Sequence, residues 1–230
     1  MNRFFYISPL ILQTFIWPMT RPLLRFCLHL DIKGLDRIPS GPEKGRGVIF
    51  ALNHSSELDP GFVPASLPFL SPYMPMFYTS RENAFYKKSG WRQVLYGGLL
   101  FRIWGAHPLQ AGKQNYELSL KTHIDILHAG KSLIMFPDGR RLPESDIGTI
   151  AHGGIGYLAW KTKALIIPVR IHNVHHMSLT DFLFRRRTVS VIFSTPLDVL
   201  GVFKSDVPTV DECKGASRTI MEHIRTLRTD

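Results

Sequence analysis

The chain has 230 residues, of which 44% are hydrophobic and 20% charged. This size and composition favour one folded domain and exclude a disordered chain. Lys and Arg number 28 against 18 Asp and Glu, and the net charge of +10 favours an anionic partner. No internal repeat or nucleic-acid-binding module is recognisable, so we do not expect nucleic acid to be that partner. Two cysteines, Cys27 and Cys213, exclude a disulfide framework and suit a reducing compartment, and both are predicted to pack in the interior.

The N-terminal residues 4–20 carry no formal charge and are rich in aromatic and aliphatic side chains. Pro9 and Pro18 interrupt this segment. A series of basic residues follows it: Arg21, Arg25, His29, Lys33 and Arg37. Apolar residues followed by cations favour an interfacial or re-entrant membrane anchor with its cations toward anionic lipid head groups.

Three alternatives remain for this segment: a helix packed on the protein's own core, a full membrane span, and a signal peptide. The last is disfavoured because no A-x-A-like cleavage site follows the apolar region. We therefore predict a membrane-associating helical segment over residues 1–31 and a single folded domain over residues 32–230. The protein is expected at the cytoplasmic face of a membrane.

A connecting loop is predicted for residues 32–46, followed by a buried apolar strand over residues 48–52. The strand leads into the sequence NHSSELDP at residues 53–60. His54 and Asp59 therefore lie just past a strand end, where α/β folds commonly hold their functional residues. A histidine can act as a base near neutral pH, and an aspartate can orient its ring.

Pairing His54 with Asp59 requires a non-helical turn, because residues five apart point about 140° apart on a straight helix. Pro60 favours such a turn, since the residue before a proline is displaced from helical geometry. Asp59 also suits the N-cap of a short helix predicted over residues 61–70, with Pro60 at its first position. Capping and orienting the histidine are compatible roles.

The middle of the chain alternates between apolar segments and turns. A second strand is predicted over residues 76–79. Residues 91–104 are apolar and aromatic, which favours a core helix, with contact to acyl chains or lipid as the alternative. A strand and turn are predicted over residues 105–112. An amphipathic helix follows over residues 116–128, with Gly130 at its C-cap.

A buried strand over residues 132–136 runs directly into the turn PDGRR at residues 137–141. A tight Asp-Gly turn that places Arg140 and Arg141 at a strand end suits the binding of a phosphate or carboxylate. A solvated surface turn is the alternative.

A helix over residues 155–163 and a strand over residues 164–171 come next. Pro168 within that strand indicates an edge, a bulge or a strand end. Three histidines follow: His172, His175 and His176. No acidic or cysteine partner recurs at a ligand spacing, so no metal site is predicted.

The sequence FLFRRR at residues 182–187 is either a solvated loop or a membrane-facing basic and aromatic patch. A late strand is predicted over residues 189–193. Thr209 and Glu212 form a capping-box pattern that opens the last helix. Its apolar residues recur on one face, which is predicted to pack on the core: Val210, Cys213, Ile220, Met221, Ile224 and Leu227.

Four of these segments, in this order, resemble the motifs of the glycerolipid acyltransferase family, typified by lysophosphatidate acyltransferases. They are residues 53–59 (NHSSELD), 105–112, 136–141 (FPDGRR) and 167–169 (IPV). The family has H-x-x-x-x-D, a glycine-containing block ending in arginine, F-P-E-G-T-R, and a V-P-V-like strand. The resemblance covers roughly residues 33–200. With the predicted elements, it implies an α/β fold with a mixed central sheet flanked by helices in one acyltransferase domain.

The resemblance implies an O-acyltransferase that moves a fatty acyl group from acyl-CoA or acyl carrier protein to a hydroxyl of a lysolipid or related lipid. His54 would be the general base and Asp59 would orient its ring. The implied substrate-binding residues are Asn53, Phe136, Pro137, Asp138, Gly139, Arg140 and Arg141. No cofactor or metal is implied beyond the thioester co-substrate. The implied partners are that thioester donor, the lipid acceptor and a membrane surface with anionic lipids.

Two departures from the family pattern bear on the acceptor. Ala111 stands where the second motif has an arginine that helps to hold the acceptor phosphate. In the third motif Asp138 replaces glutamate and Arg140 replaces threonine, whereas Arg141 keeps the usual arginine. Either Arg140 or Lys113 restores the missing charge, or the acceptor lacks such a phosphate, which we favour.

Two other functions stay open. The protein could be a catalytically degenerate family member that binds membranes, or a thioester hydrolase in which His54 activates water. No G-x-S-x-G sequence supports a serine hydrolase.

Overall fold

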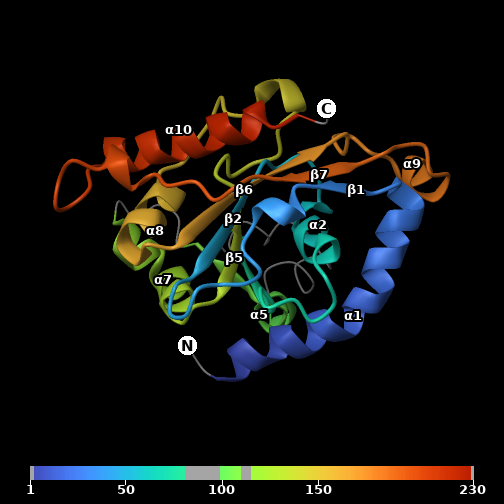
Figure 1. Cartoon of the computed structure of the whole chain (residues 1–230), viewed down its shortest axis with the longest axis horizontal. Coiled ribbons are helices and arrows are strands. Elements are labelled where there is room, and N and C mark those ends of the chain that lie inside the picture. The colour runs from blue at the N-terminus through green and yellow to red at the C-terminus, as the bar shows by residue number, and fades with distance from the viewer. Residues whose placement is uncertain (1–2, 81–98, 110–114, 229–230) are drawn as a thin grey trace.

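A mixed seven-stranded sheet lies at the centre of the residues that the structure, a computed structural model, describes: 3–80, 99–109 and 115–228 (Figure 1). Its strands, in order across the sheet, are β1 (Asp31–Lys33), β7 (Ser190–Phe193), β6 (Leu165–His172), β2 (Val48–Leu52), β5 (Ser132–Met135), β3 (Met76–Ser80) and β4 (Ala106–Pro108). Neighbouring strands of this sheet are parallel, except that β6 and β7 are antiparallel. The predicted mixed α/β sheet is confirmed.

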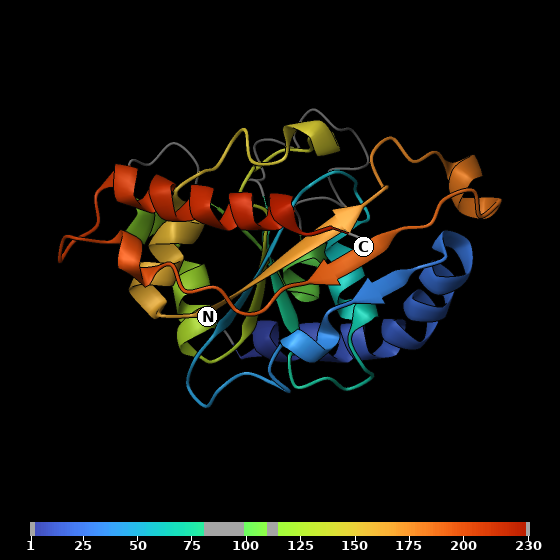
Figure 2. The ribbon, with the colours of Figure 1, turned by 45° about the horizontal axis from the view of Figure 1, so that its top comes forward.

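Helices cover both faces of the sheet. They are α1 (Phe4–Leu28), α2 (Asp59–Ser66), α5 (Leu99–Trp104), α6 (Tyr116–Ser119), α7 (Lys121–His128), α8 (Gly154–Thr162), α9 (Leu179–Leu183) and α10 (Val210–Thr226), with 3-10 turns at Leu35–Arg37, Glu144–Asp146 and Leu200–Val202. Figures 1 and 2 both show α1 and α10 on opposite sides of the sheet.

The side chains of β2 alternate between these two layers. Phe50 and Leu52 belong to a core shared with α1 and α2. Ile49 and Ala51 belong to a second core shared with α7, α8 and α10. All five residues of the strand are buried, which explains why the sequence shows a continuous apolar run there.

The prediction that prolines interrupt the N-terminal segment was wrong. Helix α1 runs continuously through Pro9, Pro18 and Pro22, although each proline removes one N–H donor from the helix. The helix bends around the domain in Figure 1, and prolines are a usual cause of such bending. Packing holds it in place, because Leu24 and Leu28 lie in the core of the domain.

One polar side chain joins α1 to the sheet. Gln13 is buried, and its Nε2 donates to the carbonyl oxygens of Met76 at 2.7 Å and Trp104 at 3.0 Å. Its Oε1 accepts from the amide of Met76 at 2.8 Å. The N-terminal helix is therefore packed on the protein's own core. In the described residues, no helix has the length and hydropathy needed to cross a membrane.

Long-range pairing corrected one local prediction, the loop over residues 32–46, and excluded the edge position that was one of three alternatives for Pro168. Residues 31–33, at the start of the predicted loop, form β1 because they pair with β7. The strand β6 is not at an edge, although it contains Pro168. The carbonyl of Pro168 accepts from the amide of Ser194 at 3.0 Å, just past the end of β7. Pairing with β7 thus stops at the proline, where a backbone donor is missing.

The helix predicted over residues 116–128 is two helices, α6 and α7, that meet at Leu120. Leu120 is buried in the second core and has a non-helical conformation. The capping box of Thr209 and Glu212 is confirmed at the start of α10. The interior face of α10 carries Cys213 as predicted, and Cys27 is buried too, whereas Val210 is exposed.

Candidate active site

The loops that follow β2 and β5 meet at the carboxyl edge of the parallel strands. His54 lies two residues after β2, and the turn of residues 136–141 follows β5. The amide of His54 donates to Oδ2 of Asp138 at 3.2 Å, and the amide of Leu142 donates to the carbonyl of His54 at 2.8 Å. These two backbone contacts fix the predicted motifs against each other, at the edge where α/β sheets usually bind ligands.

His54 and Asp59 are in direct contact. Nδ1 of His54 lies 2.8 Å from Oδ2 of Asp59, whose side chain is completely buried. The same oxygen accepts the amides of Ser55 at 2.6 Å and Ser56 at 2.8 Å. Because this oxygen already accepts two backbone N–H groups, it also suits a donor at Nδ1 of His54, the tautomer in which Nε2 of the neutral ring carries no proton.

Asp59 does not cap α2 as predicted. It is the first residue of the helix, and Leu58 occupies the N-cap position. Its carboxylate turns back to the two amides of the preceding turn instead of to the helix. The non-helical turn expected for residues 55–58 is thus held by the same carboxylate that contacts His54.

Phe136 and Asp138 support the histidine from the other loop. The rings of Phe136 and His54 stack with centroids 4.4 Å apart. Asp138 is fully buried, and its Oδ1 has no hydrogen-bond partner. Burial raises the pKa of Asp138 to about 7, an effect that the hydrogen bond from the His54 amide reduces only in part.

The side chain of Asn53 forms hydrogen bonds within the sheet. Its Nδ2 donates to the carbonyl of Ile171 at 3.0 Å, and its Oδ1 accepts the amide of Ile171 at 2.8 Å. The side chain thereby continues the pairing of β2 with β6 while the main chain turns away toward His54. Asn53, Pro137 and Asp138 are buried and do not line the cavity beside His54, whereas the other predicted substrate-binding residues do.

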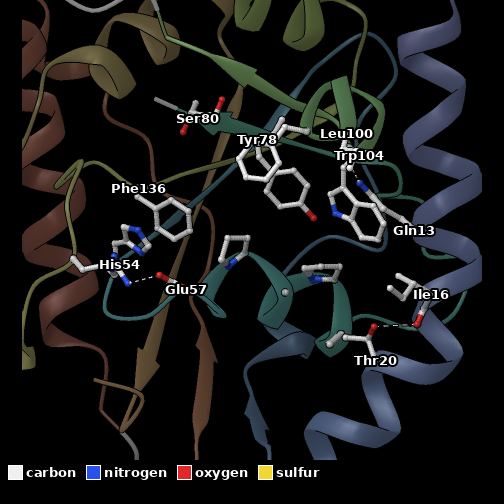
Figure 3. Close-up of a pocket in the computed structure, with 18 of the residues that line it drawn as sticks. Gln13, Ile16, Thr20, His54, Glu57, Tyr78, Ser80, Leu100, Trp104 and Phe136 are labelled. Atoms are coloured by element: carbon white, nitrogen blue, oxygen red, sulfur yellow. Dashed lines mark hydrogen bonds and ion pairs between the residues drawn. The ribbon is translucent and has the colours of Figure 1, made fainter. Parts of the chain in front are cut away.

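That cavity has a volume of about 860 Å³ and runs from His54 to the inner face of α1 (Figure 3). Figure 3 shows His54 and Glu57 at one end and Gln13, Ile16 and Thr20 at the other. Most of its lining is apolar: Ile16, Trp17, Pro60, Pro64, Ala65, Met74, Leu100, Phe101, Trp104, Ala106, Leu109 and Phe136. Such a lining suits an extended hydrocarbon chain with its reactive end at His54.

Several cavity residues were not predicted as site residues. Gln13 and Trp17 come from α1, and no local pattern shows that this helix closes a cavity formed 40 or more residues later. Glu57 lies within the first motif, and its Oε1 is 3.1 Å from Nη1 of Arg141. Its place between His54 and Asp59 was the one available signal.

Two of the three histidines near the end of β6 have separate hydrogen-bond partners, and the rings of His175 and His176 contact each other with centroids 4.0 Å apart. Nδ1 of His172 is 3.0 Å from Oε2 of Glu144, and Nδ1 of His175 is 3.3 Å from the carbonyl of Ser55. Within residues 3–80, 99–109 and 115–228, no three side chains of a metal-binding type are grouped to hold an ion. Ala111 and Lys113, on which the acceptor prediction partly depends, lie outside the described residues, as do residues 91–98.

These features define an α/β protein with a histidine–aspartate pair at one end of an apolar cavity. A family model described as Acyltransferase matches residues 29–172, more than half of the chain. The protein belongs to this acyltransferase family. Its fold is also similar to that of the 1-acyl-sn-glycerophosphate (LPA) acyltransferase PlsC from Thermotoga maritima, with a TM-score of 0.56. The match has 17% sequence identity and covers 95% of this chain and 83% of that chain.

Proposed function

We propose that the protein transfers a fatty acyl group from a thioester, acyl-CoA or acyl carrier protein, to a hydroxyl of a lysolipid or related lipid. The observation that carries the proposal is the contact of His54 with the buried Asp59 at one end of an apolar cavity of about 860 Å³. The proposal is also supported by the family membership and by the likeness to a structure named as an LPA acyltransferase.

In the proposed reaction, Nε2 of His54 accepts the proton of the acceptor hydroxyl as its oxygen attacks the thioester carbonyl. The new C–O bond forms, the C–S bond breaks, and the leaving thiolate takes the proton from the imidazolium. Asp59 holds Nδ1–H throughout and stabilises the positive ring electrostatically. General-base assistance of this kind is worth about 10²–10⁴-fold in rate.

We further propose that the outer face of α1 lies on the cytoplasmic face of a membrane with anionic lipids. Its exposed apolar side chains that do not line the cavity are Phe4, Ile7, Leu10, Ile11, Phe15, Met19, Leu23 and Phe26. The guanidinium of Arg185 lies 4.2 Å from the ring centroid of Phe26, which connects this face to the basic and aromatic residues after α9. An apolar helix face bordered by arginines is suited to an interfacial position.

The catalytic proposal is tested with His54→Gln and, as a matched control, His128→Gln. His128 is exposed at the end of α7 and does not line the cavity. Thioester consumption and acylated lipid are measured together on a panel of lysolipids. His54→Gln should lower kcat by about 10²–10⁴-fold, and His128→Gln should leave it unchanged.

Three results would contradict this assignment. Equal kcat for wild type and His54→Gln would remove His54 from the reaction. Thioester consumption without acylated lipid would identify a hydrolase. Vesicle binding without any thioester consumption would identify a degenerate member of the family.

A further inference from the structure

A carboxylate, that of Glu57, lies at the His54 end of the cavity and is paired with an arginine of the turn. Glu57, Arg140 and Arg141 all line the cavity at the end that holds His54. Oε1 of Glu57 lies 3.1 Å from Nη1 of Arg141. Figure 3 shows Glu57 beside His54 at this end of the cavity. An acceptor whose hydroxyl reaches His54 must therefore lie close to one negative and two positive side chains.

The ion pair changes what the two arginines can bind. The Arg141 guanidinium already contacts a carboxylate, and a phosphate that took this position would have to displace Glu57 and then lie beside its charge. Within the residues that the structure describes, no ion pair or hydrogen bond is recorded for the side chain of Arg140. Arg140 is thus available to an anion, whereas Arg141 is available only to a ligand that also forms an ion pair or hydrogen bond with Glu57.

The pair is weak enough for such a ligand to open. Glu57 and Arg141 are both more than half exposed, with 63% and 53% of their side chains accessible. Exposed pairs of this kind contribute little to stability. A ligand with an ammonium group and an anionic group replaces both halves of the pair, whereas an anion alone leaves Glu57 without its partner.

We propose that Glu57 selects a lysolipid acceptor whose head group carries an ammonium and an anionic group together. The ammonium binds the carboxylate of Glu57, the anionic group binds Arg140 and Arg141, and the hydroxyl lies at Nε2 of His54. This inference rests on the proposed acyl transfer to a lysolipid and names the class of acceptor. An acceptor with a phosphate monoester and no cation is disfavoured by the charge of Glu57.

The test is calorimetric binding of lysolipids to the full chain in detergent, without any thioester. Three lysolipids with the same acyl chain are compared: one with a phosphate monoester, one with phosphoglycerol and one with phosphoethanolamine. The wild type should bind the phosphoethanolamine lipid most tightly. Glu57→Gln should weaken that binding about fivefold and tighten binding of the phosphate monoester about fivefold, as expected for removing one charge at contact distance in water.

The control is Glu43→Gln, which removes the carboxylate of another surface pair, 3.3 Å from Nη1 of Arg46. This pair precedes β2, at the opposite end of the strand from His54, and should affect none of the three affinities. Glu57→Ala should change the affinities in the same directions as Glu57→Gln. Because alanine has no amide group, this agreement would assign the effect to the lost charge and not to a hydrogen bond of the glutamine.

A wild type that prefers the phosphate monoester would overturn the inference. So would a Glu57→Gln variant whose affinities for the three lipids change by one common factor. Because no donor is present, this result does not depend on acyl transfer. A protein that passes the binding test but makes no acylated lipid would contradict the proposed function alone.

Discussion

His54 contacts two aspartates, Asp59 and Asp138, whose hydrogen-bonding surroundings differ. In both aspartates Oδ1 is buried without a partner, but Oδ2 of Asp59 is contacted by Nδ1 of His54 and two backbone amides, whereas Oδ2 of Asp138 accepts the amide of His54. A carboxylate with few donors is costly to bury, so the pKa of Asp138 is raised to about 7. The turn after β5 therefore contains a group that changes protonation near neutral pH.

We expect Asp138→Asn to change how stability depends on pH. The folded-state pKa of about 7 is above the ordinary aspartate value of 3.8, so the native protein holds this proton more tightly than the unfolded chain. Wild-type stability should therefore fall as the pH rises from about 4 through 7, by at most about 4 kcal/mol. Asparagine is neutral throughout and can still accept the amide of His54.

The measurement is the free energy of unfolding in urea at pH 4, 6 and 8. The two proteins should differ least at pH 4, and the variant should be the more stable by a growing margin at higher pH. Asp36→Asn, at an exposed aspartate, is the control. A difference between Asp138→Asn and wild type that does not vary with pH would show that Asp138 is ionised in the folded protein.

The residues of the site could be predicted where the chemistry is local. His54 and Asp59 are five positions apart, and the strand before them and the proline after them indicated where they lie. Asn53 was predicted to bind substrate, but its amide pairs with Ile171, 118 positions away. Glu57 was not identified, because its partner Arg141 is 84 positions away and comes close only when β2 and β5 pair.

At the scale of elements, Gln13 connects α1 to β3 and α5. Gln13→Leu would remove the partners of three buried or half-buried backbone groups in Met76 and Trp104. Unsatisfied buried groups cost about 1–3 kcal/mol each. We expect the substitution to lower the free energy of unfolding in urea by about 2–4 kcal/mol, since part of this cost is relieved by local adjustment.

The matched control is Met19→Gln on the same helix, where the side chain is 73% exposed. It should change the free energy of unfolding by less than about 0.5 kcal/mol. Equal effects of the two substitutions would mean that the inner face of α1 is not packed on the sheet in solution.

Elements with a strong local pattern were predicted well. The apolar runs of β2 and β5 and the capping box of α10 need no distant partner to be recognised. The short strand β1 was missed because three residues carry no pattern, and β7 supplies its pairing. Packing also determines the structure of α1, because contacts with the domain outweigh the helix-breaking effect of its three prolines.

At the scale of the whole molecule, the net charge of +10 and the exposed apolar face of α1 should act together on a membrane. We expect binding to vesicles that contain anionic lipid, weaker binding to neutral vesicles, and a decrease with added salt. Replacing Arg185, Arg186 and Arg187 with glutamine should lower the affinity for anionic vesicles at least tenfold, at about 1 kcal/mol per basic residue. Vesicle sedimentation measures both effects.

The control is Lys214→Gln with Arg218→Gln, two exposed positions on α10. Helix α10 lies on the other side of the sheet from α1 (Figure 2). The affinity should then fall by less than threefold, since these charges are far from the proposed surface. A loss equal to that of the arginine triple variant would mean that total charge, and not the α1 surface, governs binding.

The contacts of Gln13 also bear on how the protein is made. This residue leaves the ribosome 63 positions before Met76 and 91 before the carbonyl of Trp104. At about 5–20 residues per second, it waits roughly 3–13 seconds for the first of these partners. During that interval the apolar residues 4–28 lack the sheet that later covers the inner face of α1. We therefore expect the nascent chain to be prone to aggregation through this segment until residues 76–104 have been synthesised.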